Sequence, residues 1–226
     1  LKHQVMDMEH LDYWHTGDYT VNETYTPSPE IETVEEFYVT IDKDSKTSVR
    51  EMVANDLPFT AYIKLIKQDK KTGKVVTLSN ATFSLYKLNE ENNTWEKITC
   101  KVGKDYFTSW TTDSEGIART ENKLEAGHYK VDEISIPSGF LQLDEELIFD
   151  VNNRNKTLNY DKDLDAWITV TVKNEQPTAK LVIDKSVALR ENVDTSLVDV
   201  SDLSKIKFKL VAKENVIDMA DGSVIH

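Results

Sequence analysis

The sequence predicts an all-β protein built from tandem β-sandwich domains, one complete and two partial. Three observations predict this: apolar and polar residues alternate with a period of two in many short runs, polar turn clusters separate the runs, and a segment of about 110–120 residues repeats. The alternation is typical of a half-buried strand, because successive side chains of a strand point to opposite faces. We therefore expect two sheets packed face to face.

The strand-like runs follow one another along the middle of the chain. The first lies in residues 62–67, the next around Phe83 and Leu85, and a third in residues 127–133. The clearest run is 167–174, where two valines, an isoleucine and an asparagine share one face. Clusters of turn-forming residues separate the runs, at positions 71–74, 90–93, 113–116 and 152–155.

An internal repeat covers both sides of this region. The segment GDYTVNE at 17–23 matches GHYKVDE at 127–133, and VANDLP at 53–58 matches VKNEQP at 172–177. A new strand opens after each of these prolines, first in YIKLIK and later in KLVIDK. The copies are spaced by the length of a domain, which is far longer than a solenoid unit.

The repeat predicts a domain layout. We expect the C-terminal part of a first domain in residues 1–58, a complete domain in 59–177 and the N-terminal part of a third domain in 178–226. Very short junctions at Pro58 and Pro177 favour a stiff rod of domains. Because the chain starts without Met and without an apolar signal run, we expect it to be a piece of a longer protein.

Three polar residues fall on predicted apolar faces. Lys67 shares a face with Ile63 and Leu65, Glu133 continues the face of Tyr129 and Val131, and Asn174 ends the apolar face of the last strand. If these faces form the core, an amine, a carboxyl and an amide are buried together, and they must compensate one another. Burial lowers the pKa of an amine and raises that of a carboxyl, so a neutral amine could attack the amide, release ammonia and leave a cross-link.

The alternative is a strand register in which Lys67 and Glu133 face solvent, as these residue types usually do. The flanking copies favour burial, because Glu23 follows the alternation of Tyr19 and Val21, and Lys185 follows that of Leu181 and Ile183.

Several motifs in order resemble the Cna B-type (prealbumin-like, SpaA-like) domains of Gram-positive pilins and adhesins. YKVDEISIPSGF at 129–140 resembles the E-box of that family, KQDKKTG at 67–73 its first strand and turn, and VTVKN at 170–174 its last strand. TTDSEG at 111–116 and LEAGHY at 124–129 resemble its middle. The resemblance covers nearly all of residues 59–177 and, in halves, both flanks.

The resemblance implies an autocatalytic isopeptide bond between Lys67 and Asn174, assisted by Glu133. Lys64 competes as the nucleophile, but it lies on the opposite face of its strand.

In the partial domains, Glu23 would assist a reaction of Asn55 with a lysine before residue 1, and Lys185 would need an asparagine beyond residue 226. The missing halves also motivate a head-to-tail self-association, in which residues 178–226 of one molecule complete residues 1–58 of another.

Composition narrows the possible partners. The formal net charge of −13 makes nucleic acid and anionic membranes poor partners, and no apolar run is long enough to span a bilayer. The single cysteine, Cys100, excludes an intramolecular disulfide. We expect no metal and no cofactor, because the histidines lack ligand spacing and the acidic loop 161–165 lacks the glycine and glutamate of a calcium loop.

The sequence therefore predicts a structural stalk module of a bacterial adhesin or pilus-like protein that lies outside the cell, at the cell wall or cell surface, and is not an enzyme. Its partners would be other domains of the same protein. The alternative is an adhesin module that recognises a host matrix protein or glycan through aromatic residues around Trp95 and Trp110. A third possibility is an accessory domain that spaces a catalytic unit lying elsewhere in the parent protein.

Overall fold

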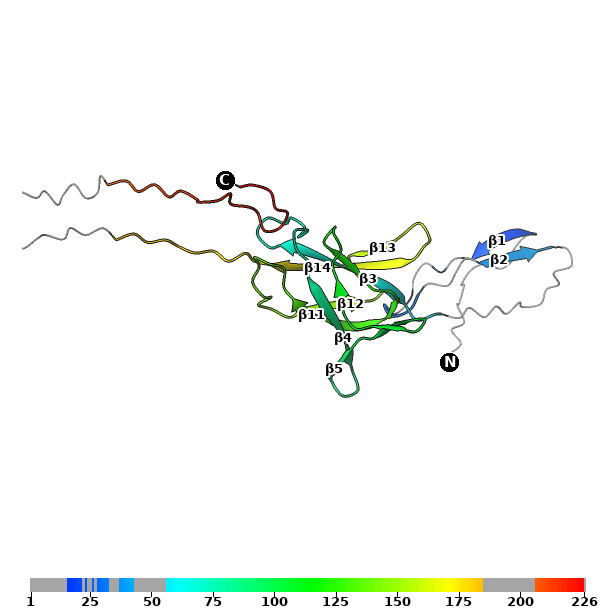
Figure 1. The fold of residues 1–226 in the computed structure, drawn as a ribbon. Coiled ribbons are helices and arrows are strands. Elements are labelled where there is room, and N and C mark those ends of the chain that lie inside the picture. The colour runs from blue at the N-terminus through cyan, green and yellow to red at the C-terminus, as the bar shows by residue number, and fades with distance from the viewer. Residues whose placement is uncertain are drawn as a thin grey trace, which may run out of the picture.

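The computed structural model describes residues 16–21, 23, 26, 28–32, 37–42, 56–184 and 206–225. Its regular elements are all β-strands, and the described residues form no helix. The all-β prediction is thereby confirmed. Figure 1 shows a central sandwich with the hairpin of the first strands at one end and the C-terminal segment at the other. No helix of the described part is long and apolar enough to cross a membrane.

The first sheet is built around two parallel strands, β3 (Thr60–Asp69) and β14 (Ala166–Asn174). These are the first and last strands of the central domain, and they lie side by side along their whole length (Figure 1). Short antiparallel strands complete the sheet. They are β13 (Leu158–Tyr160) beside β14, with β9 (Ile117–Arg119) and β10 (Leu124–Glu125) beside β3.

The second sheet is antiparallel and is centred on β4 (Thr82–Asn89) and β11 (Gly127–Ser135). It is extended by β12 (Leu147–Val151) next to β11, and by β5 (Thr94–Lys97) and β8 (Trp110–Thr111) next to β4. A separate hairpin joins β6 (Cys100–Val102) to β7 (Asp105–Phe107).

The core lies between the inward faces of the two sheets. The predicted alternation is seen in β3 and β14, where every second side chain is buried. The core side chains of these two strands and their counterparts in the second sheet are Ile63, Leu65, Ile168, Val170, Val172, Phe83, Leu85, Tyr129 and Val131. Ser84 departs from the simple pattern, because it is buried as well and its hydroxyl donates to the Thr108 carbonyl at 3.1 Å.

The hairpin of β1 (Gly17–Val21) and β2 (Phe37–Ile41) pairs in the same register as β11 and β12. Gly17 faces Ile41, as Gly127 faces Val151 in the central domain. Each partner is shifted by the same 110 positions in the sequence. The repeat therefore has a structural counterpart in this hairpin.

The C-terminal flank differs from the expectation for the third copy. Residues 180–184, where a new strand is predicted, form no strand, and Leu181, Val182 and Ile183 are exposed. Strands need partners for their backbone groups, and no described strand lies beside this segment. Residues 206–225 are also without strands, although Ile217 and Val224 form an isolated bridge.

Candidate isopeptide site

Lys67, Glu133 and Asn174 meet inside the sandwich, at one end of the core. Lys67 lies on β3 and Asn174 ends β14, whereas Glu133 reaches across from β11 of the opposite sheet. Their exposed fractions are 0%, 6% and 1%. The predicted burial of all three residues is therefore what the structure shows, and the solvent-facing register is wrong.

The parallel pairing of β3 and β14 places the lysine and the asparagine together. Lys67 is opposite Val172, and Asn174 is opposite Asp69, so the two residues are diagonal neighbours on the inward face. Side chains at such diagonal positions are within reach of each other when one is long. Lys67 Nζ accordingly donates a hydrogen bond to Asn174 Oδ1.

Glu133 touches both nitrogen atoms of this pair. Its Oε1 lies 2.9 Å from Lys67 Nζ, and its Oε2 accepts a hydrogen bond from Asn174 Nδ2 at 2.5 Å. Asn174 Nδ2 also donates to the carbonyl of Leu141 at 2.8 Å. Within the described residues Oε1 has no hydrogen-bond partner, so the contact with Lys67 is what compensates its burial.

Burial lowers the pKa of the Lys67 amine below its ordinary value of 10.5, and the close contact with the negatively charged Glu133 opposes this shift only in part. A lysine in this environment reaches the neutral, nucleophilic form more easily than a surface lysine.

Backbone hydrogen bonds fix the strands around the site. The Lys67 amide donates to the carbonyl of Gly116 at 3.0 Å, and the Lys67 carbonyl accepts from Val76 at 2.8 Å. Gly116 has a φ of +72°, and a Cβ at this position would lie 2.5 Å from the Val76 carbonyl oxygen. Only glycine fits this close approach without moving the backbone that holds Lys67.

Backbone hydrogen bonds also hold the end of β14 in place at Asn174. The Asn174 carbonyl accepts from the amide of Lys70 at 2.9 Å, and the next residue, Glu175, accepts from the amide of Leu141 at 2.8 Å. Leu141 thus holds both the side chain of Asn174 and the backbone beside it. Sequence reasoning missed Leu141, because a main-chain acceptor has no side-chain signal.

Two other predicted site residues that the structure describes, Lys64 and Glu23, are not part of this cluster. Lys64 lies opposite Thr169 on the outward-facing side of β3, apart from the buried trio. Glu23 is half-buried just beyond β1, in the position that corresponds to Glu133. Asn55 and Lys185 lie outside the described residues.

Trp95 and Trp110 do not form a common aromatic surface. Trp110 is buried in the core, and its indole nitrogen donates to Glu121 at 2.6 Å. Trp95 lies on the outer side of the second sheet, where the amine of Lys130 is 5.3 Å from its ring centroid. Cys100 is also buried, and burial raises the pKa of its thiol, which disfavours the reactive thiolate.

The fold and this geometry define the central domain as a prealbumin-like β-sandwich. A family model agrees: residues 61–164 match SpaA, the prealbumin-like fold domain. The resemblance to Cna B-type domains is confirmed for this region. The matched residues include Lys67 and Glu133 and end before Asn174.

Three solved structures match this chain at low identity. The minor pilin of Streptococcus agalactiae is 19% identical with a TM-score of 0.41, covering 77% of this chain and 66% of that protein. The Bacillus anthracis TIE protein is 19% identical with a TM-score of 0.39, covering 71% of this chain and 25% of that protein. The major pilin subunit of Bacillus cereus is 23% identical with a TM-score of 0.36, covering 53% and 30%.

The chain therefore spans between 25% and 66% of the length of these three proteins. The comparison with curated protein sequences gives no match.

Proposed function

We propose that this chain is a structural stalk segment of a Gram-positive cell-surface protein, and that its central domain is cross-linked by an isopeptide bond between Lys67 and Asn174. The observation that carries the proposal is the contact of Glu133 with both reacting nitrogen atoms, at 2.9 and 2.5 Å, in a site with almost no solvent exposure. The likeness of the domain to SpaA-like modules supports a role at the cell surface.

The arrangement suits a reaction in which Glu133 carries protons. Glu133 Oε1 takes a proton from Lys67 Nζ, and the neutral amine attacks the side-chain carbonyl carbon of Asn174. The Glu133 carboxyl, which contacts Asn174 Nδ2 through its other oxygen, then passes this same proton to Nδ2, and ammonia leaves as the carbonyl re-forms. Nζ gives up its second proton to the carboxylate, and ammonia finally takes a proton and restores the carboxylate.

One C–N bond forms and one breaks in this reaction, and one ammonia molecule is released. No oxidant or cofactor is consumed. The packed core holds amine and amide in contact, which replaces a slow bimolecular encounter with a step inside one molecule. The reaction occurs once per domain, so the domain modifies itself and does not turn over an external substrate.

The flanks fit a tandem arrangement of such domains, with a partial domain in residues 1–58, the complete domain in 59–177 and another partial domain in 178–226. The identical register of the β1–β2 and β11–β12 hairpins supports the first of these assignments. Head-to-tail self-association through the two partial domains stays a prediction, which sedimentation of the concentrated chain tests.

The decisive experiment is the intact mass of the denatured chain, followed by peptide mapping. We expect a mass lower than the sequence value by one ammonia, with the Lys67 and Asn174 peptides joined. Lys67→Ala and Glu133→Ala should restore the full mass. The matched controls are Lys64→Ala on the outward face of β3 and Asp132→Ala beside Glu133, both of which should keep the deficit.

An unmodified mass in the folded parent chain would refute the cross-link. Loss of two ammonia molecules in a linked oligomer would instead indicate that the partial domains of neighbouring molecules also react.

A further inference from the structure

A turn from the C-terminal flank sits against the end of the central sandwich. We call residues 217–224 the docking turn. Its form is set by its own bonds: the amide of Gly222 donates to the Asp218 carbonyl, and the amide of Asp218 to the Ser223 carbonyl, each at 2.8 Å. Gly222 has a φ of +74°, which suits a tight turn. The side chains of Asp218 and Asp221 also accept from backbone amides within the turn.

The central domain offers a small apolar socket to this turn. Ala220 is fully buried in a cluster with Val76 and Phe140, and Met219 and Ile136 pack at its edge. We call the residues of the central domain that contact the docking turn here the socket. They are Val76, Ile136, Gly139 and Phe140.

Gly139 makes room for the methionine. A Cβ at Gly139 would lie 2.6 Å from Met219, and its φ of +84° also favours glycine. The contact therefore depends on a residue with no side chain at this position.

Main-chain hydrogen bonds join the two parts as well. The amides of Thr77 and Leu78 both donate to the carbonyl of Ala220, at 2.8 and 3.1 Å. The amides of Thr77 and Leu78 would lose these partners if the turn moved away, so the contact depends on the direction of hydrogen bonds as well as on apolar packing.

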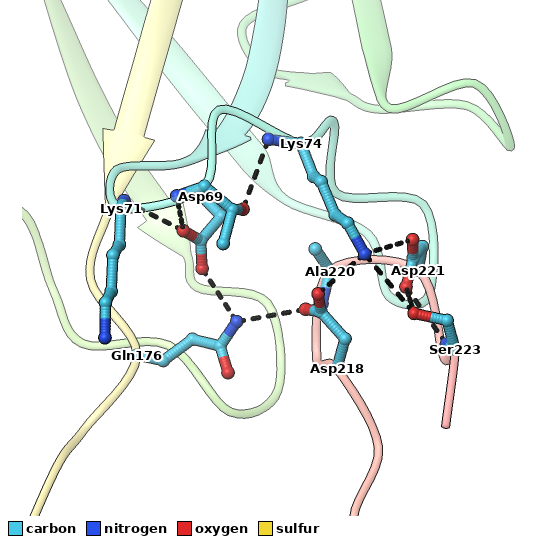
Figure 2. A network of polar contacts seen from close by, with 9 residues as sticks. Asp69, Lys71, Lys74, Gln176, Asp218, Ala220, Asp221 and Ser223 are labelled. Carbon is cyan, nitrogen blue, oxygen red and sulfur yellow. Dashed lines mark hydrogen bonds and ion pairs between the residues drawn. The ribbon is translucent and has the colours of Figure 1, made fainter. Parts of the chain in front are cut away.

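Charged and polar side chains make further contacts between the docking turn and the central domain (Figure 2). The amine of Lys74 lies 2.9 Å from a carboxylate oxygen of Asp218 and 2.9 Å from one of Asp221. Gln176, just after the last strand, donates to Asp69 at 2.7 Å and to Asp218 at 3.2 Å. Lys74 and Asp218 are 144 positions apart, so the contact is not a result of short-range chain connection.

We propose that the socket is an interdomain docking surface, and that its partner is the following module of the same chain, which presents the docking turn. Isolated ion pairs at a surface contribute little. Here the ion pairs of Lys74 accompany the fully buried side chain of Ala220 and the two main-chain hydrogen bonds to its carbonyl. Together these contacts select one position of the turn. The proposal rests on the tandem layout and goes beyond the cross-link, because it concerns how one module is held against the next.

The socket also adjoins the candidate isopeptide site. The Val76 amide donates to the Lys67 carbonyl, and Phe140 precedes Leu141, whose carbonyl holds the Asn174 side chain. Residues of the socket therefore lie next to the residues that hold Lys67 and Asn174 in place. This places the junction between modules at the end of the domain where Lys67 and Asn174 meet.

Hydrogen exchange of the full chain tests the docking. In the parent chain we expect protected amides at Thr77 and Leu78. Ala220→Arg cannot fit the socket and should speed their exchange by about tenfold or more. Ala212→Arg adds the same side chain at an exposed position of the same segment and should change nothing.

A second pair of variants tests the ion pairs between Lys74 and the docking turn. Lys74→Met removes the ion pairs with the docking turn and should also raise exchange at Thr77 and Leu78. Lys71→Met is the matched control, because Lys71 lies on the same loop and its amine points away from the turn (Figure 2).

Unchanged protection of Thr77 and Leu78 in both Ala220→Arg and Lys74→Met would overturn the proposal. General loss of protection in the core strands of Ala220→Arg would do so too, because it would mean that the turn belongs to the fold of the central domain. These results are independent of the ammonia deficit: a chain without the cross-link can still show docking, and a cross-linked chain can lack it.

Discussion

The parallel pairing of the first and last strands makes the proposed mechanical role of the central domain measurable. A pull on the chain enters the domain at the start of β3 and leaves it at Asn174, the last residue of β14. With an amide between Lys67 and Asn174, tension passes from β3 directly to the end of β14. The intervening residues then form a closed loop that carries no load.

The length of that loop sets the size of the effect. Lys67 and Asn174 are 107 positions apart. At about 3.5 Å per extended residue, a loop of this size would add about 370 Å of chain if it were free to extend. The residues of β3 before Lys67 are already extended and add almost nothing.

The assay is single-molecule stretching of the full chain held at its two ends. We expect the parent to show no step of about 370 Å and Lys67→Met to show it. Lys64→Met, a change of the same kind on the outward face of β3, should behave as the parent does. A step of this length in the parent or in Lys64→Met would refute the reasoning.

Three further predictions concern stability and docking. Glu133→Gln, which keeps the side-chain size but cannot carry protons, should leave the loop open and cost at least about 4.7 kcal/mol of stability, or about 20 °C of melting temperature by calorimetry. Gly116→Ala should destabilise the domain to urea by about 1–3 kcal/mol and more than Gly103→Ala, because a Cβ meets the Val76 carbonyl at the first site and nothing within 4 Å at the second; equal losses would contradict the role given to Gly116. The amine of Lys74 lowers the pKa of Asp221 below its ordinary value of 3.8. The ion pair therefore stabilises docking fully above pH 3.8, and this stabilisation is lost as the pH falls through the lowered pKa of Asp221. Amide NMR signals of Thr77 that shift only well below pH 3.8 would agree, and a shift near neutral pH would not.

The strand pattern was enough to predict the buried trio. Lys67, Glu133 and Asn174 continue apolar faces with a period of two, and that period leaves little freedom once the neighbouring residues are in the core. Glu133 also keeps its place although the pairing of β11 shifts register just after it.

What the sequence could not predict depends on contacts between distant segments. Ser84 is buried because a loop carbonyl from Thr108 lies beside it, and no local pattern reports such a partner. A strand after Pro177 was expected from the internal repeat and from the alternation of Leu181 and Ile183, but strands form only where other strands can pair with them. The docking turn likewise depends on how one module sits on another, which no periodicity within either module encodes.

The proposed amide between Lys67 and Asn174 would close a loop, and this has a consequence for the order of events in the life of the chain. A polypeptide passes through a narrow export pore, or into a processive protease, as a single thread. Once the amide joins two residues that are 107 positions apart, the chain can no longer be drawn out as one thread, because the ring would have to pass as two strands side by side. For a chain that is exported as a thread, export would therefore have to come before the proposed bond forms, and the cross-linked module would resist any machine that works by threading.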